Sequence, residues 1–420
     1  MTPAPVSAPL IALAVTLVVQ VLASFSLAVP SVLAPAIAGE FGLQAQQVGW
    51  LVSTAYLSAM LTGLACGGAS RRHGPVRMNQ FGLVCLALAL VLCVFTQAPL
   101  LLIAGILIGI GYGIPNPTAA DILSRHSPRE RRGLFFSIKQ TGVPGGVAIT
   151  GVLMPFLVAW FDWRTALLAM ACVLLAVALL IGGSRRTLDP VRASPAESAA
   201  TGMRPSGFLR MLATGVWQPL REVLSDPGLR RLGLVSLVYA FTQVVYLSFL
   251  VSALKLEHQL SLAAAAAMLS ASQVVSVFAR VGWGYVSDRW VDPGRLLGLL
   301  GVGMSASLMT LAFMPVGTSP ALMVVITTAC AATVVAWNGV FYAELVRQVA
   351  PGEVTRVTGA TQFLTFLGGV SGGAGFVGLL NLTGSFSASF AVVALIPLIT
   401  ALVTLRSAPR PSQPDIKGSS

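Results

Sequence analysis

Residues 262–286 read LAAAAAMLSASQVVSVFARVGWGYV, and Arg280 is the only charged side chain in this run. A helix needs about 20 mainly apolar residues to cross the hydrocarbon core of a bilayer. The rest of the chain has the same character, because 55% of its 420 residues are hydrophobic and only 10% are charged. A soluble domain has roughly 25% charged residues. The sequence therefore predicts an all-α membrane protein.

Twelve apolar segments of this length occur, and a polar segment over 185–231 divides them into two groups of six. In lipid, helices satisfy the polar groups of the backbone within each segment. The sequence thus predicts six-helix bundles over 1–184 and 232–406, with a tail over 407–420. The predicted spans are residues 10–35, 47–67, 78–96, 99–122, 134–160, 164–184, 232–254, 262–286, 294–316, 319–345, 357–381 and 386–406.

The polar segment over 185–231 begins as a linker rich in Pro, Ala and Ser. Its second part carries apolar side chains at helical spacing, which predicts an interfacial helix on the cytoplasmic leaflet. The apolar positions are Leu209, Leu212, Val216, Leu220 and Val223.

Basic residues are unevenly distributed over the loops. Of the 26 Lys and Arg, 22 fall in alternate loops or in the C-terminal tail, and the opposite loops hold only Arg164 and Lys255. The positive-inside rule then places both termini on the cytoplasmic side of a bacterial-type inner membrane. The net charge of +12 is expected to face anionic lipid headgroups, and it does not require a nucleic-acid partner.

The sequence contains no pattern typical of an enzyme. Nucleophile elbows, phosphate-binding loops and HExxH motifs do not occur. The five cysteines lie within predicted spans at spacings that match no metal site. We therefore expect no enzyme activity, no metal and no cofactor.

The two predicted bundles resemble each other at one end. Residues 67–74, GGASRRHG, follow the second span, and residues 284–289, GYVSDR, follow the eighth. Asp121 and Glu344 each lie seven residues before a proline, in the fourth and tenth spans. A duplicated six-helix unit predicts a binding site between the halves, near the membrane midplane.

The Gly-x-x-x-Asp-Arg turn at 284–289 and its echo at 67–72 resemble the signature of the major facilitator superfamily. The resemblance implies a twelve-helix secondary transporter. The first turn differs, with Arg71 where the family has an acid. Residues 280–288, RVGWGYVSD, look most like oxalate:formate antiporters and monocarboxylate transporters, in which the arginine at this position engages a substrate carboxylate. The second cation of those proteins, a lysine in span eleven, is absent from 359–365, GATQFLT.

Arg280 and Lys139 are cations at membrane depth, where each costs about 2.5–3.5 kcal/mol or more. Spans five and eight face each other in the resembled family. The two cations would then repel each other unless an anion came between them. Other interpretations remain open: Arg280 in a salt bridge or bound to carbonyl groups, and Lys139 reaching the headgroups with its long stem.

Uncharged polar and aromatic residues within the spans complete the predicted pocket, although such residues also serve as contacts between helices. Two of them, Trp337 and Tyr246, could stack on a planar substrate. Pro115 and Pro117 are expected to kink the fourth span. The other predicted pocket residues are Asn116, Gln243 and Asn338.

The acids at the ends of the fourth and tenth spans are predicted to act as latches, each pairing with an arginine of a turn in one conformation only. Expected partners are Arg72 or Arg77 for Asp121, and Arg289 for Glu344. The predicted gating residues are Arg72, Arg77, Asp121, Asp288, Arg289 and Glu344.

The leading functional prediction is a secondary transporter of a small organic anion, such as a carboxylate, acting by alternating access as a monomer. No acid lies inside spans one or seven. A co-transported proton would therefore travel on the substrate or on the acids at helix ends, and anion exchange is the other form of coupling. The alternative is efflux of multiple drugs or hydrophobic compounds, for which a buried midplane acid is expected but absent.

Overall fold

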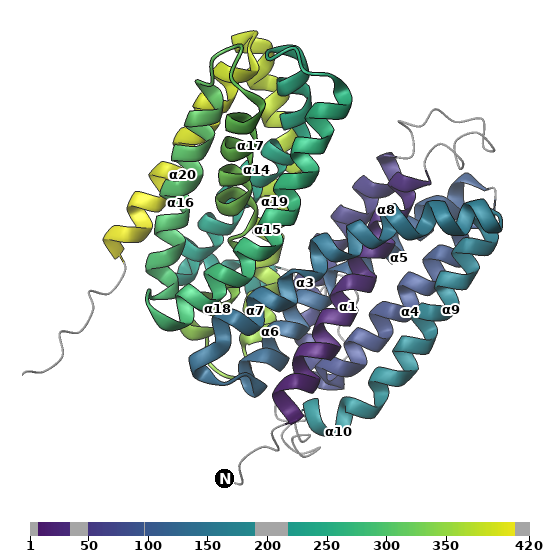
Figure 1. Cartoon of the computed structure of the whole chain (residues 1–420). Coiled ribbons are helices and arrows are strands. Elements are labelled where there is room, and N and C mark those ends of the chain that lie inside the picture. The colour runs from purple at the N-terminus through teal and green to yellow at the C-terminus, as the bar shows by residue number, and fades with distance from the viewer. Residues whose placement is uncertain (1–6, 34–48, 96, 190–216, 408–420) are drawn as a thin grey trace, which may run out of the picture.

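The computed structural model describes residues 7–33, 49–95, 97–189 and 217–407. Twelve of its helical segments are long and apolar enough to cross a membrane (Figure 1), which confirms the predicted fold class. The N-terminal half contains α1 (Ser7–Val32), α3 (Gly49–His73), α4 (Pro75–Cys93), α5 (Ala98–Gly113), α6 (Pro115–His126), η2 (Arg129–Arg131), α7 (Arg132–Gln140), α8 (Gly142–Trp160), α9 (Trp163–Ile181), η3 (Gly182–Ser184) and α10 (Arg185–Leu188). The C-terminal half contains α13 (Gln218–Ser225), α14 (Pro227–Leu256), α15 (Leu262–Arg289), α16 (Pro293–Ala312), α17 (Pro320–Cys330), η5 (Ala331–Val335), α18 (Asn338–Gln348), α19 (Val354–Thr383) and α20 (Phe386–Ser407).

Three spans are broken in the middle, and prolines explain two of the breaks. A helical N–H normally donates to the carbonyl four residues earlier, and proline has no N–H. Pro117 therefore leaves the carbonyl of Gly113 free where α5 gives way to α6. In the same way Pro144 leaves the carbonyl of Gln140 free between α7 and α8. The third break separates α17 from α18 at the π-turn η5.

The two halves touch mainly along α3, α6 and α7 on one side and α15, α18 and α19 on the other. Figure 1 shows the halves meeting toward the end at which α1 begins and diverging toward the other end. We call the first the closed end and the second the open end. At the closed end α3 crosses α19 so tightly that a Cβ on Gly359 would overlap the carbonyl of Gly63. Only glycine fits there.

The predicted interfacial helix is described only in part. Leu209, Leu212 and Val216 lie outside the described residues. Leu220 and Val223 belong to α13, where both are buried and where the helix packs against α14 and α19. Its place on the cytoplasmic leaflet stays a prediction.

At the open end, Glu257 joins the α14–α15 loop to the start of α20. Its carboxylate accepts hydrogen bonds from the backbone N–H groups of Phe386 and Ser387 and from the hydroxyls of Ser385 and Ser387. Burial alone would raise the pKa of Glu257, but these hydrogen bonds together lower it below its ordinary value. The ionised form therefore stabilises the fold.

Glu257→Gln is expected to destabilise the protein by about 1 kcal/mol at neutral pH, as loss of a helix cap does. Because the folded-state pKa is lowered, the wild-type advantage is present above the ordinary value near 4.5 and is lost as the pH falls through the folded-state value. Thermal unfolding in detergent between pH 3 and pH 7 measures this. Lys255→Gln, in the last turn of α14, is the control and should leave the profile unchanged. A variant as stable as the wild type at pH 7 would contradict the prediction.

Candidate functional site

A cavity of about 470 Å³ lies between the halves, at the level of the broken spans. Helices α1, α3 and α5–α8 form one wall, and α14, α15, α18 and α19 form the other. The lining includes five of the residues predicted from the sequence, namely Asn116, Gln243, Arg280, Trp337 and Asn338.

Arg280 is buried in this wall, with 2% of its surface exposed. Its Nη1 donates to the carbonyl of Gln140 at 2.8 Å, and its Nη2 donates to the carbonyl of Val335 at 2.9 Å. Among the residues described, its Nε has no hydrogen-bond partner and no carboxylate pairs with the guanidinium. The carbonyl groups freed at two helix breaks therefore hold the side chain while its charge stays unpaired.

Lys139 lies behind the wall rather than in it. Its Nζ donates to Gln20 Oε1 at 2.6 Å and to Asn116 Oδ1, and lies 6.0 Å from the ring centroid of Tyr342. The side chain is 2% exposed and does not reach for headgroups. No acid pairs with it among the residues described. Instead of facing the cavity beside Arg280, Lys139 orients Asn116, which does line it.

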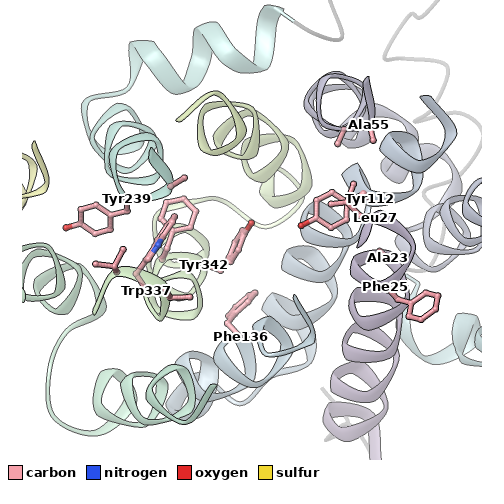
Figure 2. Packing of buried hydrophobic residues seen from close by; sticks show 14 of the residues in the cluster. Ala23, Phe25, Leu27, Ala55, Tyr112, Phe136, Tyr239, Trp337 and Tyr342 are labelled. Carbon is pink, nitrogen blue, oxygen red and sulfur yellow. The ribbon is translucent and has the colours of Figure 1, made fainter. Parts of the chain in front are cut away.

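Aromatic rings from both halves line the cavity. Tyr112 and Phe366 stack at 5.9 Å with an interplanar angle of 19°, and Tyr56 meets both rings edge-on. Figure 2 shows Trp337 and Tyr342 of one half and Tyr112 of the other around the same central space. Such a surface suits a flat, partly apolar ligand.

Tyr246 is not in the cavity wall. It is fully buried inside the C-terminal half, where its hydroxyl donates to the Thr327 carbonyl at 2.8 Å and lies 3.1 Å from Ser272 Oγ. These bonds hold α14 to α15 and α17. The expected stacking of Tyr246 on substrate therefore does not follow from the structure.

Several lining residues were not predicted, among them Tyr56, Tyr112, Gln140, Tyr342, Gln362 and Phe366. A signal in the sequence was available for two of them, Gln140 and Gln362. A proline four residues after a carbonyl leaves that carbonyl free to accept from a donor on another helix. Gln140 and Gly113 both satisfy this rule, and each accepts a hydrogen bond from the other half.

At the closed end, Asp288 of α15 caps α7 of the other half. Its carboxylate accepts hydrogen bonds from the N–H groups of Gly133 at 2.7 Å and Leu134 at 2.8 Å. An anion at a helix N-terminus is stabilised by the unpaired amides and by the helix dipole. A side chain on Gly133 would overlap Ser287, so the contact requires glycine.

The motif at residues 67–72 uses the reverse arrangement of charges from the motif at 284–289, with a base in place of the acid. Arg71 forms an ion pair at 3.1 Å with Glu353, the residue before the first turn of α19 in the other half. The acid thus lies at the start of α19, and the base lies in the last turn of α3. This arrangement accounts for Arg71 at a position where an acid was expected.

Arg71→Asp is expected to weaken the closed end, because it places a second carboxylate against Glu353. Adding Glu353→Gln should restore the wild-type state, since the new acid could then face the α19 N-terminus alone. The effect is small, about 0.2–1 kcal/mol for so exposed a pair. Spin-label distances across the closed end measure it. A double variant no better than Arg71→Asp would contradict this prediction.

The acids at the ends of the fourth and tenth spans pair within their own helices. Asp121 bonds Arg125 one turn later at 2.8 Å, and Glu344 bonds Arg347 at 2.8 Å. The spacings i,i+4 and i,i+3 bring these partners together more readily than a distant turn does. The expected partners Arg72, Arg77 and Arg289 form no ion pair with any residue in the described ranges.

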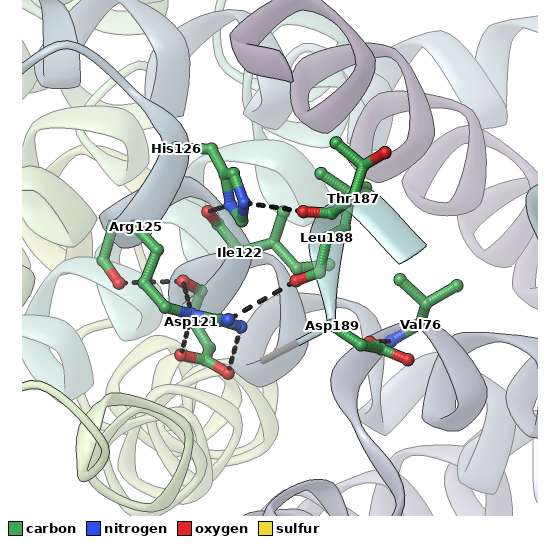
Figure 3. A network of polar contacts seen from close by, with 9 residues as sticks. Val76, Asp121, Ile122, Arg125, His126, Thr187, Leu188 and Asp189 are labelled. Atoms are coloured by element: carbon green, nitrogen blue, oxygen red, sulfur yellow. Dashed lines mark hydrogen bonds and ion pairs between the residues drawn. The ribbon is translucent and has the colours of Figure 1, made fainter. Parts of the chain in front are cut away.

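Figure 3 shows how the end of α6 is tied to the chain after span six. Nη1 of Arg125 donates to the Leu188 carbonyl at 3.4 Å, and Nε2 of His126 lies 3.2 Å from the Thr187 carbonyl. Asp189 accepts from the N–H of Val76 at 2.9 Å and so caps α4. The Asp121 pair therefore belongs to a network inside the N-terminal half.

The sequence model of the Major Facilitator Superfamily matches residues 16–373. The chain belongs to the Major Facilitator Superfamily. It is a transporter rather than an enzyme, as predicted. Within the described ranges, no group of three or more His, Cys, Asp or Glu side chains could hold a metal ion.

Relatives in the superfamily include proteins named for organic acids. The gallate transporter of Pseudomonas putida is 26% identical over 44% of this chain and 42% of its own length. Monocarboxylate transporter 13 of Bos taurus is 27% identical over 76% of this chain and 70% of its own length. The uncharacterized transporter YybO of Bacillus subtilis is 32% identical over 34% of this chain. The chain spans 33% of YybO and less than half of the gallate transporter.

The fold is shared with solved members of the superfamily. The fucose:proton symporter FucP of E. coli, in an outward conformation, superposes with a TM-score of 0.71. The match covers 94% of this chain and 99% of FucP at 17% sequence identity. At this identity the similarity concerns the fold alone.

Proposed function

We propose that this transporter carries a small aromatic monocarboxylate across a bacterial-type inner membrane by alternating access. The observation that carries the proposal is Arg280, a buried guanidinium in the wall of the cavity that has no acid partner in the described chain. A guanidinium binds carboxylates strongly and keeps its charge at any physiological pH. The aromatic lining supports a ring next to the carboxylate. The names of two relatives, for gallate and for monocarboxylates, agree with this chemistry.

The orientation proposed from the loop charges makes the closed end cytoplasmic and the structure outward-facing. The substrate would then enter through the open end and reach the cavity from outside. Both termini would lie in the cytoplasm.

The contacts of Arg280 supply a route from binding to movement. Arg280 belongs to the C-terminal half, and its bond to the Gln140 carbonyl crosses to the N-terminal half. A carboxylate that binds the guanidinium competes with that carbonyl for the same N–H groups. Substrate binding would weaken a contact between the halves. It would thereby shift the population toward a conformation in which the closed end opens.

Uptake of radiolabelled benzoate and lactate into proteoliposomes, with and without a preloaded pool of the same acid, tests the proposal. We expect benzoate to be taken up and exchanged, and lactate to compete weakly because it lacks a ring. Empty liposomes give the background from diffusion of the protonated acid. Transport of lipophilic cations with no response to any carboxylate would reject the proposal and favour drug efflux.

A further inference from the structure

Gln362 lies on α19 at the contact between the two halves, with 1% of its surface exposed. Its Nε2 donates at 3.0 Å to the carbonyl of Gly113, which Pro117 leaves free. Because a carbonyl can only accept, this bond identifies the amide nitrogen and leaves Oε1 as the other atom. Oε1 is buried, and within the described chain it has no hydrogen-bond partner.

An unpaired buried acceptor is unusual, since folded proteins pair most buried polar groups. Among the residues that line the cavity, only two have a buried side-chain nitrogen or oxygen without a partner in the described ranges. One is the donor Nε of Arg280, and the other is the acceptor Oε1 of Gln362. The cavity wall thus contains, on two of its residues, one cationic donor and one neutral acceptor that lack a partner in the described chain.

The acceptor lies beside the aromatic wall. Phe366 follows Gln362 by one helical turn on α19, and Tyr112 precedes the bonded Gly113 on α5. These two rings form the stacked pair of the cavity. A ring lying against this pair would bring its substituents near the amide oxygen.

We propose that Gln362 is a specificity-determining residue whose Oε1 accepts a hydrogen bond from a ring hydroxyl of the substrate. This inference rests on the proposed function and narrows the substrate to hydroxylated aromatic monocarboxylates. The carboxylate goes to Arg280, and the hydroxyl goes to Gln362. A second carboxylate at the ring would meet an acceptor oxygen rather than a cation, so aromatic dicarboxylates are excluded.

Isothermal titration of the purified full-length protein tests the proposal. The probes are benzoate, 3- and 4-hydroxybenzoate, the two corresponding methoxybenzoates and terephthalate. A methoxy group occupies the same position as a hydroxyl but cannot donate. We expect one hydroxybenzoate to bind at least about 10-fold tighter than its methoxy analogue, which is the effect of one satisfied buried acceptor. Terephthalate should bind more weakly than benzoate.

Gln362→Met removes the acceptor at nearly constant volume, and we expect it to bring the hydroxy-to-methoxy ratio close to one while benzoate still binds. Gln243→Met is the matched control in the same cavity, because Gln243 Oε1 is already occupied by Trp337 Nε1 at 3.0 Å. It should keep the ratio, whatever its effect on overall affinity.

The outcomes separate the two proposals. If the wild type binds benzoate but binds the hydroxy and methoxy acids with equal affinity, the role of Gln362 is overturned. The proposed function is left intact by that result. A ratio that survives in Gln362→Met also overturns the role of Gln362. Binding of no carboxylate at all overturns both. The wild-type comparison decides even if the variant fails to fold.

Discussion

Arg280→Gln is expected to abolish uptake of aromatic acids and to weaken their binding by about 30-fold or more. Removing one partner of a buried charge pair costs about 2–5 kcal/mol, and 1.4 kcal/mol corresponds to a factor of ten. Glutamine retains one amide donor but neither the charge nor the planar fork. Isothermal titration with benzoate measures the loss of affinity, and uptake into proteoliposomes measures the loss of transport.

Two further variants distinguish charge from geometry. Arg280→Lys keeps the charge but lacks the planar fork that reaches the carbonyls of Gln140 and Val335, so an intermediate affinity is expected. Lys139→Met removes a cation that lies behind the wall and should weaken binding less than Arg280→Gln does. Benzoate binding by Arg280→Gln with wild-type affinity would reject the assignment of Arg280.

The second large effect is expected at the closed end. Asp288→Ala removes a carboxylate that accepts two backbone N–H groups of the opposite half. A hydrogen bond to a charged group contributes about 1.5–3 kcal/mol, so we expect the closed end to open roughly 10- to 150-fold more often. Asp288→Asn, which keeps one acceptor oxygen but no charge, should shift the population less.

Spin labels at residues 131 and 290, on opposite halves at the closed end, report this change. Labels at residues 160 and 382 report the open end, where both side chains are exposed. The exposed Cys172 must first be replaced. In Asp288→Ala the first distance should lengthen and the second should shorten. Glu130→Gln, in the short helix η2 that also contains Arg131, is the control and should change neither distance. Unchanged distances in Asp288→Ala would show that this cap does not hold the closed end.

The residues that hold the closed end could be predicted only in part. The Gly-x-x-x-Asp-Arg turn marked Asp288, and the structure gives it a partner in the other half. The partners expected for Asp121 and Glu344 were wrong, because arginines one turn away on the same helix compete better than arginines on another element. The pairing of Arg71 with Glu353 could not be read from the chain, since it depends on which residue of α19 faces the turn.

For this protein, the sequence by itself determined the twelve spans and the scarcity of buried charge. Both depend on local properties, namely the length of an apolar segment and the presence of a charged side chain within it. Prolines 115, 117 and 144 also determined which carbonyls are left free, because proline has no backbone N–H in any fold.

Only the tertiary structure decided which donors take those carbonyls and which side chains face the cavity. It put Lys139 behind the wall and Tyr246 inside a bundle, and it brought Gln362 to the cavity wall with an Oε1 that has no partner in the described chain. The reason is that orientation toward the cavity depends on how each helix is rotated against its neighbours. That rotation is set by packing between segments as far apart as Gly63 and Gly359, which no local pattern encodes.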